Sequence, residues 1–579
     1  MPPPRTTAPT YDATNPLFVQ PDRSILLETF SPRYAEARDA IAPFAELEKS
    51  PEHIHTYRIS NLSLWNAAAA GFTAKQMVAV LQKYTKFPLP ANIATDIEET
   101  VARYGRVKLD RLDETRLRLR CDDKALLEEL ARQPKVRGYL GEKLDAASYA
   151  IDAAHRGVLK LALIQVGYPA EDLAGYVEGA ALPTQLRDVA ASGLPFTVRD
   201  YQREAADIFY AGGDVKGGSG VIVLPCGSGK TIVGIAGMAR IQKSTLILTT
   251  SVAAVKQWKR EILDKTDLKP EDIAEYTGDS KEIGPVTIAT YQIITYRPDK
   301  EEDFPHFKIF DQRDWGLIIY DEVHLLPAPV FRVTAQIQAR RRLGLTATLV
   351  REDGREGDVF SLIGPKKYDV PWRELETQGW IAAATCTEIR VALPTEQRMD
   401  YAVAELRDKY RIASENPTKD DVVARLLENH ARERVIVIGQ YIRQLKQLAA
   451  RFGIPLITGA TPNAEREDLY AKFRRGEVRH LILSKVGNFA IDLPDANVLI
   501  QVSGTFGSRQ EEAQRLGRVL RPKADGEGAH FYTLVTRDTR EIEFAQHRQM
   551  FLTEQGYSYA IADEGDVLRT PASEVRNAG

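Results

Sequence analysis

A run of small, basic and hydroxyl residues at positions 224–231, Leu-Pro-Cys-Gly-Ser-Gly-Lys-Thr, has the residue types and spacing of a phosphate-binding loop. It follows an apolar strand and opens a helical segment, so backbone N–H groups and the helix N-terminus would surround the phosphates. Lys230 would neutralise the β- and γ-phosphate oxygens, and the Thr231 hydroxyl would ligate Mg²⁺. The strict pattern has glycine where Leu224 stands, which leaves a structural turn as the alternative. We expect ATP and Mg²⁺ to bind here, through Pro225, Cys226, Gly227, Ser228, Gly229, Lys230 and Thr231.

An acidic pair follows another predicted strand further along the chain. The apolar segment 317–320 runs straight into Asp321-Glu322-Val323-His324, and strand ends are where α/β proteins place catalytic groups. Asp321 would hold Mg²⁺ through its water shell, and Glu322 would orient and deprotonate an attacking water. An exposed acidic turn is the alternative for these four residues alone. Together with the phosphate-binding loop they predict ATP hydrolysis.

Three further elements could link hydrolysis to movement. His324 and the hydroxyls of Thr346 and Thr348, which follow a third apolar strand, could connect the nucleotide site to a second site. Later in the chain, Arg518 and Arg521 lie three residues apart, on one face of a segment that is helical in this prediction. Their guanidinium groups could stabilise the charge that develops during phosphoryl transfer, with Gln514 as a coupling residue. A solvated basic helix is the alternative.

The elements that must position these residues are read from the apolar segments of the chain. Short apolar strands alternate with amphipathic segments around the phosphate-binding loop, and again after residue 430. This alternation predicts an α/β fold with two parallel sheets, joined near residues 371–380. The expected strands are 221–224, 245–248, 287–290, 317–320 and 342–345 in the first sheet, and 435–438, 456–458, 481–484, 498–501 and 530–534 in the second.

The part of the chain before these sheets is predicted to be mainly helical. Apolar residues recur at helical spacing between residues 59 and 105, and residues 116–121, Arg-Leu-Arg-Leu-Arg-Cys, alternate as in a strand with a basic face. Two helices and such a hairpin suggest a winged-helix-like module at about 59–121, whose basic strand could follow a phosphate backbone. A solvated strand face is the alternative. Further helices are expected at 126–130, 147–153 and 159–163, before a break at 192–195.

Length and composition fit a multidomain globular protein. The 579 residues exceed what one hydrophobic core supports, and the 44% hydrophobic and 27% charged residues exclude a wholly disordered or collagen-like chain. The net charge of -3 is silent on nucleic acid, because binding depends on local charge. Cys121, Cys226 and Cys386 outline neither a disulfide framework nor a zinc site, and no segment reaches membrane-spanning length. We expect a cytoplasmic protein without a membrane partner, with disordered tails at 1–20 and 562–579.

With these motifs assembled, the chain from about residue 196 to 557 resembles the superfamily 2 helicases, and among them the XPB type. The segment 199–202, Arg-Asp-Tyr-Gln, is similar to the family's adenine-side motif, which implies nucleotide contacts by Arg199 and Gln202. Segments 249–258, 276–278 and 290–292 are similar to its strand-tracking motifs, and segment 351–353 matches an element that XPB-type helicases place at the duplex fork. The resemblance therefore implies DNA contacts by Arg351, Glu352, Asp353, Trp258, Thr277, Gly278 and Tyr291.

The resemblance also implies a domain order and an activity. The domains would be a DNA-sensing N-terminal domain at 21–195, helical from 122 onward, and two RecA-like lobes at 196–372 and 373–561, with a thumb insertion at about 395–430. The activity would be that of an ATP-dependent DNA helicase that separates strands 3'-to-5' in nucleotide excision repair. Its substrate would be single-stranded, forked or distorted DNA, and a repair nuclease or other repair proteins would be its partners.

Three other functions share parts of this pattern. A double-strand translocase, or an ATP-gated switch that distorts DNA without processive unwinding, would carry the same motor motifs. An RNA helicase would differ in reading the 2'-hydroxyl. A non-catalytic protein built on a decayed motor is disfavoured, because the lysine, hydroxyl, carboxylates and arginines of the nucleotide site are all present.

Overall fold

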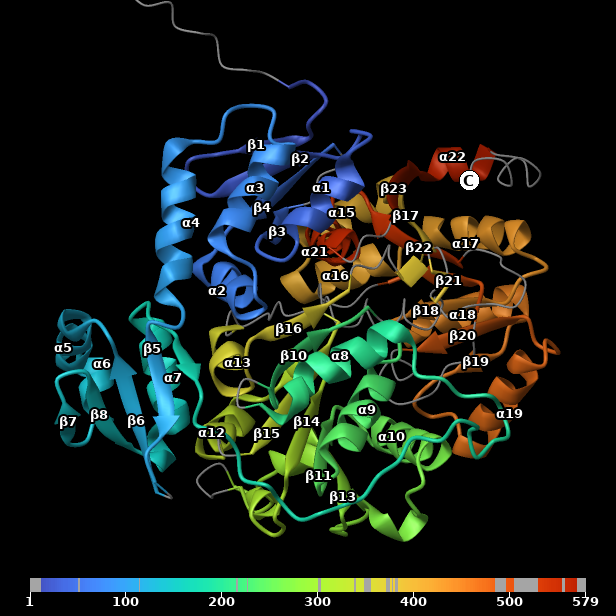
Figure 1. Cartoon of the computed structure of the whole chain (residues 1–579). Coiled ribbons are helices and arrows are strands. Elements are labelled where there is room, and N and C mark those ends of the chain that lie inside the picture. Colours follow the sequence, from blue (N-terminus) through green and yellow to red (C-terminus); the bar gives the residue numbers. More distant parts are fainter. Residues whose placement is uncertain are drawn as a thin grey trace, which may run out of the picture. The chain divides into compact units, whose positions relative to one another are not determined.

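The structure is a computed structural model with two compact units, which are described separately. The first comprises residues 1–224 and 229–370, and the second comprises residues 225–228 and 371–579 (Figure 1). The structure describes residues 12–569 except 50–52, 114, 215–216, 226, 300–303, 338–339, 348–355, 371–374, 377, 381–383, 485–495, 504–528 and 555–557. Within these described residues, no helix is both long enough and apolar enough to cross a membrane.

The first unit begins with an antiparallel sheet covered by helices, here called the first N-terminal region (residues 12–104). Its strand order is β1-β2-β4-β3, and Leu17, Ile25 and Leu27 of the sheet share one core with Leu64, Met77 and other apolar helix residues. Ser60 and Thr73 cap α2 and α3 by accepting backbone hydrogen bonds. The elements are β1 (Leu17–Val19), β2 (Ser24–Glu28), α1 (Tyr34–Ile41), β3 (Glu46–Lys49), β4 (Ile54–Arg58), α2 (Asn61–Ala69), α3 (Ala74–Tyr84) and α4 (Ala91–Arg103).

A second sheet with its own core follows, the second N-terminal region (residues 105–172). Its strand order is β7-β8-β6-β5-β9, and Leu117 and Leu119 of β6 pack with Leu127 of α5 and Leu163 of α7. The predicted winged-helix grouping differs from this arrangement, because the helices before residue 105 pack on the first sheet and the hairpin belongs to the second. The elements are β5 (Val107–Arg111), β6 (Arg116–Cys121), α5 (Lys124–Arg132), α6 (Pro134–Arg137), β7 (Lys143–Asp145), β8 (Ser148–Asp152), α7 (Arg156–Gln165) and β9 (Ala170–Asp172).

Three local predictions are corrected. The helix expected at 147–153 is strand β8, which pairs with β6; a short apolar run does not distinguish the two states. The tail expected at 1–20 contains β1, which pairs with β2. The tail expected at 562–579 contains the end of β23 (Ser558–Asp563) and helix α22 (Glu564–Arg569).

The segment between the N-terminal regions and the first lobe is held to that lobe by backbone hydrogen bonds. Residues 173–196, here called the belt, run as the teal trace from α7 toward α8 (Figure 1). Its backbone pairs with residues near the amino ends of strands β11 (Thr245–Thr249) and β14 (Leu317–Asp321) and at the end of α10 (Val252–Lys265). The bonds of 2.8–3.0 Å are Ala180 N to Asp314 O, Leu182 N to Gln242 O, Ser244 N to Ala180 O, Arg187 N to Lys265 O and Ala191 N to Asp264 O.

The rest of the first unit is a seven-stranded parallel sheet in the order β12-β13-β11-β14-β15-β10-β16. Its central strands are buried on both faces, as apolar sequences such as Leu-Ile-Ile-Tyr require. All five expected strands are present, and β12 and β16 are additional. The remaining elements are α8 (Asp200–Tyr210), β10 (Ser219–Val223), α9 (Lys230–Ile241), β12 (Ile273–Tyr276), β13 (Val286–Thr290), α11 (Tyr291–Ile294), α12 (Ala328–Gln336), β15 (Arg341–Thr346), α13 (Glu356–Leu362) and β16 (Lys366–Asp369).

The second unit is built on another seven-stranded parallel sheet, in the order β19-β20-β18-β21-β22-β17-β23. Helices α17 and α18 cover one face, where Val422 and Leu445 pack on Val435 and Val437. The five expected strands are present, and β17 and β23 extend the sheet. The elements are β17 (Ala384–Val391), α15 (Thr395–Val403), α16 (Leu406–Ser414), α17 (Thr418–Asn429), β18 (Val435–Gly439), α18 (Ile442–Phe452), β19 (Leu456–Ile457), α19 (Asn463–Arg474), β20 (His480–Ser484), β21 (Val498–Gln501), β22 (Ala529–Thr536) and α21 (Glu541–Glu554).

Candidate active site

Three neighbouring strands of the first sheet deliver the predicted nucleotide-site residues to one edge. Strands β14, β15 and β10 lie side by side and parallel, with Asp321 opposite Leu345 and Val223 opposite Thr346. The backbone N–H of Leu224 donates to the carbonyl of Thr346 over 2.9 Å, which fixes the start of the phosphate-binding loop. Because parallel strands share one carboxyl edge, the loop after β10, the acidic pair after β14 and the threonine after β15 come together.

The phosphate-binding loop joins β10 to helix α9, which begins at Lys230. Gly227 and Gly229 have φ angles of 81° and 83°, a backbone conformation that disfavours other residues. A Cβ at position 229 would lie 2.6 Å from Nε2 of Gln202, so the glycine also makes room for that side chain. The hydroxyl of Ser228 donates to the carbonyl of Pro225 over 2.6 Å. The loop therefore has the two glycines where its turn needs them.

Gln202 is buried at the start of α8 and lies against this loop. Its Oε1 accepts a 3.1 Å bond from the backbone N–H of Arg199, and its Nε2 donates to the Tyr201 hydroxyl over 3.4 Å. Nη1 of Arg199 donates to the same hydroxyl over 3.0 Å. These bonds fix the direction of the amide beside Gly229, the position from which a glutamine could contact a nucleotide base.

The acidic pair lies next to the lysine of the loop. Nζ of Lys230 is 3.5 Å from Oε1 of Glu322. Glu322 has a φ of +50°, a strained conformation for a residue with a side chain. Burial raises the pKa of Asp321 to about 6, and the neighbouring Glu322 carboxylate acts in the same direction, while a bond from Trp258 and the charge of Lys230 oppose them. The lysine predicted to neutralise phosphate and the carboxylate predicted to act as the base are therefore adjacent.

The two predicted coupling residues that the structure describes are in contact. Nδ1 of His324 lies 2.6 Å from Oγ1 of Thr346, and 3.5 Å from Oε2 of Glu322. Both His324 and Thr346 are buried. A movement of β15 would therefore reach the acidic pair through one imidazole ring.

The residues proposed as DNA contacts in this unit divide into two groups. The side chains of Trp258, Thr277 and Tyr291 are buried. The indole of Trp258 donates to Oδ2 of Asp321 over 2.8 Å, and the Tyr291 hydroxyl donates to the Asp321 carbonyl over 3.0 Å. These two aromatic side chains thus hold Asp321, instead of presenting a surface to DNA. Gly278 is exposed. The sequence carried no signal for this supporting role.

Several predicted site residues lie outside the described residues. These are Cys226, Thr348, Arg351, Glu352, Asp353, Gln514, Arg518 and Arg521. Their roles stay predictions.

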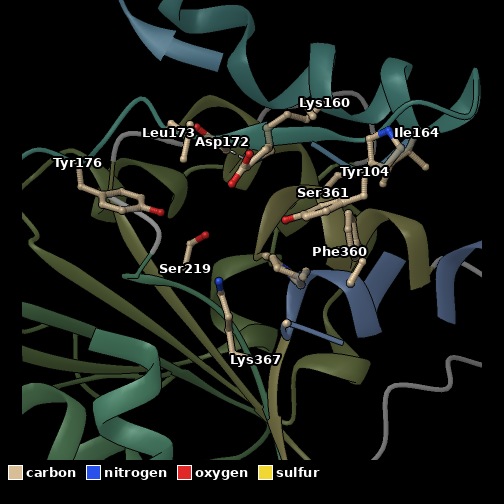
Figure 2. Close-up of a pocket in the computed structure, with 18 residues that line it drawn as sticks. Tyr104, Lys160, Ile164, Asp172, Leu173, Tyr176, Ser219, Phe360, Ser361 and Lys367 are labelled. Carbon is tan, nitrogen blue, oxygen red and sulfur yellow. Dashed lines mark hydrogen bonds and ion pairs between the residues drawn. The ribbon is translucent and has the colours of Figure 1, made fainter. Parts of the chain in front are cut away.

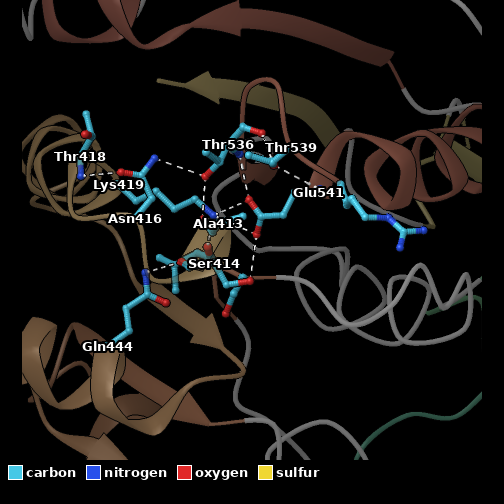
Figure 3. A network of polar contacts seen from close by, with 12 residues as sticks. Ala413, Ser414, Asn416, Thr418, Lys419, Gln444, Thr536, Thr539 and Glu541 are labelled. Carbon is cyan, nitrogen blue, oxygen red and sulfur yellow. Dashed lines mark hydrogen bonds and ion pairs between the residues drawn. The ribbon is translucent and has the colours of Figure 1, made fainter. Parts of the chain in front are cut away.

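The second unit contains a buried ion pair that the sequence did not reveal. Lys419 of α17 and Glu541 of α21 are 0% and 3% exposed, with Nζ and Oε2 2.8 Å apart (Figure 3). Nζ also donates to the Val502 carbonyl over 3.0 Å, and Glu541 accepts from the Ser414 hydroxyl and the Thr536 backbone N–H. A buried ion pair that is fully hydrogen-bonded fixes the relative positions of the two helices that carry it more than it adds to the stability of the fold. It ties the helical segment predicted at 395–430 to α21 and, through the Thr536 N–H, to the end of β22.

Comparison with known proteins identifies three family models in this chain. They are the ERCC3/RAD25/XPB C-terminal helicase at 375–574, the helicase conserved C-terminal domain at 17–145, and the type III restriction enzyme, res subunit, at 195–351. These segments contain the whole second sheet, all strands of the first parallel sheet except β16, and most of the N-terminal regions.

Curated relatives match almost the whole chain. The chain is 55% identical over 553 residues to the DNA 3'-5' helicase XPB of Mycobacterium tuberculosis, covering 96% of this chain and 98% of the relative. It is 54% identical over 552 residues to the protein of the same name from Kineococcus radiotolerans, covering 95% and 97%. It is 34% identical over 615 residues to the general transcription and DNA repair factor IIH helicase/translocase subunit XPB/SSL2 of Saccharomyces cerevisiae, covering 95% and 72%.

Proposed function

This chain belongs to the XPB family of DNA helicases, and from that premise we propose that it uses ATP hydrolysis to separate DNA strands 3'-to-5' in nucleotide excision repair. The observation that carries the proposal is that Lys230, after the loop that follows β10, lies next to Glu322 and Asp321 at the end of β14, in a chain 55% identical to a relative named DNA 3'-5' helicase XPB. DNA is the substrate, and single-stranded, forked or distorted DNA is the proposed form.

In the proposed reaction, the chain's own groups bind phosphate and activate water. The loop after β10 and the N-terminus of α9 hold the phosphates, and Lys230 neutralises their charge. Glu322 takes a proton from the attacking water, and its position 3.5 Å from Lys230 supports this role because it lies beside the proposed phosphate site. Gln202 and Arg199 contact the base. On sequence grounds, Arg518 and Arg521 stabilise the transition state, and Gln514 and Thr348 take part in coupling.

Mg²⁺ is the proposed metal cofactor, and the donor set fits it. The Thr231 hydroxyl and the Asp321 carboxylate are hard oxygen ligands of the kind that this ion prefers. A cation beside Asp321 would also offset the cost of burying that carboxylate, whose pKa burial raises to about 6. When bound with ATP, Mg²⁺ neutralises charge on the phosphate oxygens.

DNA sensing by residues 21–195 is a further proposal, and the charge on β6 limits how it could work. Each arginine of the strand lies within 4.0 Å of a carboxylate: Arg116 beside Asp113, and Arg118 and Arg120 beside Asp110. A phosphate backbone would have to displace these carboxylates, so β6 is not a free basic track. We propose DNA contacts at Arg351, Glu352, Asp353 and Gly278, repair proteins such as a nuclease as partners, and the cytoplasm as the location.

The proposal is tested by strand displacement on forked DNA with tails of opposite polarity. The expected result is ATP-dependent unwinding of forks with a 3' loading tail, and none with Lys230→Ala. Unwinding from the 5' tail alone would contradict the polarity. Stimulation of ATPase activity by RNA but not by DNA would contradict the substrate.

A second candidate function is double-strand translocation without unwinding, which the name helicase/translocase of the yeast relative favours. Displacement of a triplex-forming strand from blunt duplex, without fork unwinding, would support translocation instead. Both assays use the same protein and the same Lys230→Ala control, so their outcomes can be compared directly.

A further inference from the structure

A cavity of about 270 Å³ lies in the first unit, away from the nucleotide site. Its walls come from both N-terminal regions, the first residues of the belt, and α13, β10 and β16 of the lobe (Figure 2). Ser219, which lines it, is the first residue of β10, whereas the phosphate-binding loop follows the last residue of that strand. The cavity therefore lies at the amino end of β10, whereas Lys230 lies beyond its carboxyl end. Its volume is near the lower end of small-molecule sites, about 300–1,000 Å³.

A buried hydroxyl belongs to the wall of this cavity. Ser361 of α13 is 2% exposed, and its Oγ has no hydrogen-bond partner among the described residues. Ser361 is among the residues that line the cavity (Figure 2). A serine inside a helix normally bonds to a carbonyl of the preceding turn. A buried hydroxyl without a partner is costly, so this one indicates that a polar group occupies the cavity.

Positive charge is concentrated at the same place. Asp172 accepts bonds of 2.7 Å from Nη2 of Arg156 and 2.9 Å from Nζ of Lys160, so two buried cations share one carboxylate. Arg342, also buried, stacks on the ring of Tyr176 at 5.7 Å. The second carboxylate of the lining, Glu171, lies 4.0 Å from Lys108. In the lining, Lys160 and Lys367 balance Asp172 and Glu171, and the surplus positive charge comes from Arg156 and Arg342, which lie outside the lining.

Lys367 adds a cation on the opposite wall, and two aromatic rings supply an apolar wall. Figure 2 shows the Lys367 ammonium group extending into the cavity toward Ser219. The rings of Tyr104 and Phe360 meet edge to face, with centroids 6.4 Å apart and planes at 78°. Ile164 and Pro365 continue the apolar wall. A ligand that fits this lining has one anionic end and one apolar side.

We propose that the cavity binds a small organic anion, with one carboxylate or phosphate group near Lys367 and Ser361 and an apolar body against Tyr104 and Phe360. A charged oxygen would accept a hydrogen bond from Ser361 and share the positive field of Lys160 and Arg342. The ligand would contact both N-terminal regions and the motor lobe at once, so its binding would stiffen their junction. This site is independent of the proposed helicase reaction.

Isothermal titration calorimetry of the full chain with benzoate tests the proposal, with benzamide as the neutral analogue of the same shape. Benzoate should bind saturably and benzamide should not. Lys367→Met should weaken benzoate binding at least tenfold, and Ser361→Ala several-fold. Because Oγ of Ser361 has no hydrogen-bond partner in the part of the chain that the structure describes, Ser361→Ala should leave the fold intact, so its effect reports on the ligand.

Two variants control for binding elsewhere. Lys366→Met removes a neighbouring lysine whose Nζ pairs with Asp369 at 2.9 Å and which does not line the cavity, so it should bind benzoate like the wild type. Lys230→Ala should also retain binding, because the phosphate-binding loop is a separate anion site. Equal binding of benzamide, no binding of benzoate, unchanged affinity in Lys367→Met, or loss in Lys230→Ala would each overturn the proposal, leaving water as the partner of Ser361.

Discussion

The indole Nε1 of Trp258 donates a 2.8 Å hydrogen bond to Oδ2 of Asp321, across from helix α10 to the end of β14. The same ring lies over Gly234 of α9, where a Cβ would be only 2.5 Å from Cη2. One side chain, 1% exposed, therefore contacts both the carboxylate of the acidic pair and the helix that begins with Lys230. The spacing between the phosphate-binding loop and the acidic pair depends on this ring.

The first prediction is that Trp258→Phe raises the Mg²⁺ concentration that ATPase activity requires, without unfolding the protein. Phenylalanine keeps an aromatic ring against Gly234 but cannot donate to Asp321, whose charged form that bond favours. A hydrogen bond to a charged group is worth about 1.5–3 kcal/mol, so the Mg²⁺ concentration at half-maximal ATPase activity should rise about tenfold or more. ATPase assays over a Mg²⁺ series measure this.

Trp315→Phe is the matched control for this change. Trp315 is equally buried in the same lobe, and its indole donates over 2.8 Å to the Ile309 carbonyl, away from the acidic pair. Trp315→Phe should lower the stability of the protein without altering the Mg²⁺ dependence of its ATPase activity. The same Mg²⁺ shift in both variants would mean that loss of stability, and not the bond to Asp321, is responsible.

The role of Trp258 could not be predicted from the sequence. Its bond to Asp321 joins residues 63 positions apart, and nothing in the local pattern distinguishes a supporting indole from a DNA-facing one. The acidic pair and the loop could be predicted, because each follows a run of consecutive apolar residues in a strand. Strands such as β16, Lys-Lys-Tyr-Asp, were missed because their polar residues hide the pattern.

The N-terminal half was harder to predict for a different reason. The hairpin β5–β6 was grouped with the helices that precede it in sequence, but it packs with α5 and α7, which follow it. The belt resembled a linker at residues 192–195, since its order comes from backbone bonds to distant residues and not from apolar spacing. Long-range pairing of this kind leaves no periodic signal.

The second prediction is that Glu322→Gln abolishes turnover and preserves ATP binding. Glutamine keeps the shape and the strained backbone at this position, but it cannot take a proton from water. The rate constant for hydrolysis should fall about 10²- to 10⁴-fold, with ATP affinity within a few-fold of wild type. Single-turnover hydrolysis and equilibrium ATP binding measure the two quantities. Turnover near the wild-type rate would refute the assignment of Glu322 as the base.

The third prediction is that Thr346→Val separates ATP hydrolysis from strand separation. Valine has the shape of threonine but leaves Nδ1 of His324 without the hydroxyl that lies 2.6 Å away. DNA-independent ATPase activity should stay within about threefold, and fork unwinding should fall tenfold or more, a loss of about 1.4 kcal/mol in coupling. Thr334→Val, which removes a buried hydroxyl beside Tyr320 in the same lobe, is the control and should affect both activities alike.

The fourth prediction concerns the belt and compares two of its glycines. Both Gly179 and Gly193 have positive φ angles, of 75° and 83°, so alanine costs about 1–2 kcal/mol of backbone strain at either position. At Gly179 the added Cβ would also lie 2.3 Å from the Cα of Gly316, whereas at Gly193 nothing lies within 4 Å. Gly179→Ala should therefore loosen the belt and Gly193→Ala should not.

Hydrogen exchange of the belt amides measures this difference directly. The N–H groups of Ala180 and Leu182 donate to the lobe, and they should exchange at least tenfold faster in Gly179→Ala. Equal exchange in the two variants would show that the belt is held without the close contact at Gly316.

The fifth prediction is a pH dependence of stability that comes from Asp172. Arg156 and Lys160 hold the pKa of this buried carboxyl far below its usual range. The unfolded chain therefore binds a proton near pH 4 that the folded chain does not, and the stabilisation by Asp172 is present above that pH and lost below it. Asp172→Asn should destabilise the protein by about 3–5 kcal/mol at pH 7, because it leaves two buried cations without their carboxylate.

Lys160 makes the stability of the protein depend on pH in the alkaline range. Burial lowers its pKa to about 8, so between pH 8 and about 10.4 the unfolded chain keeps a proton that the folded chain has lost, and stability rises with pH in this window. Lys160→Met should remove that rise.

Asp110→Asn is the control, because Asp110 also faces two arginines but on a more exposed strand, where a pair is worth about 1 kcal/mol or less. Denaturant unfolding followed between pH 3 and pH 10 compares the variants, and a curve for Asp172→Asn parallel to that of the wild type below pH 5 would exclude this role for Asp172.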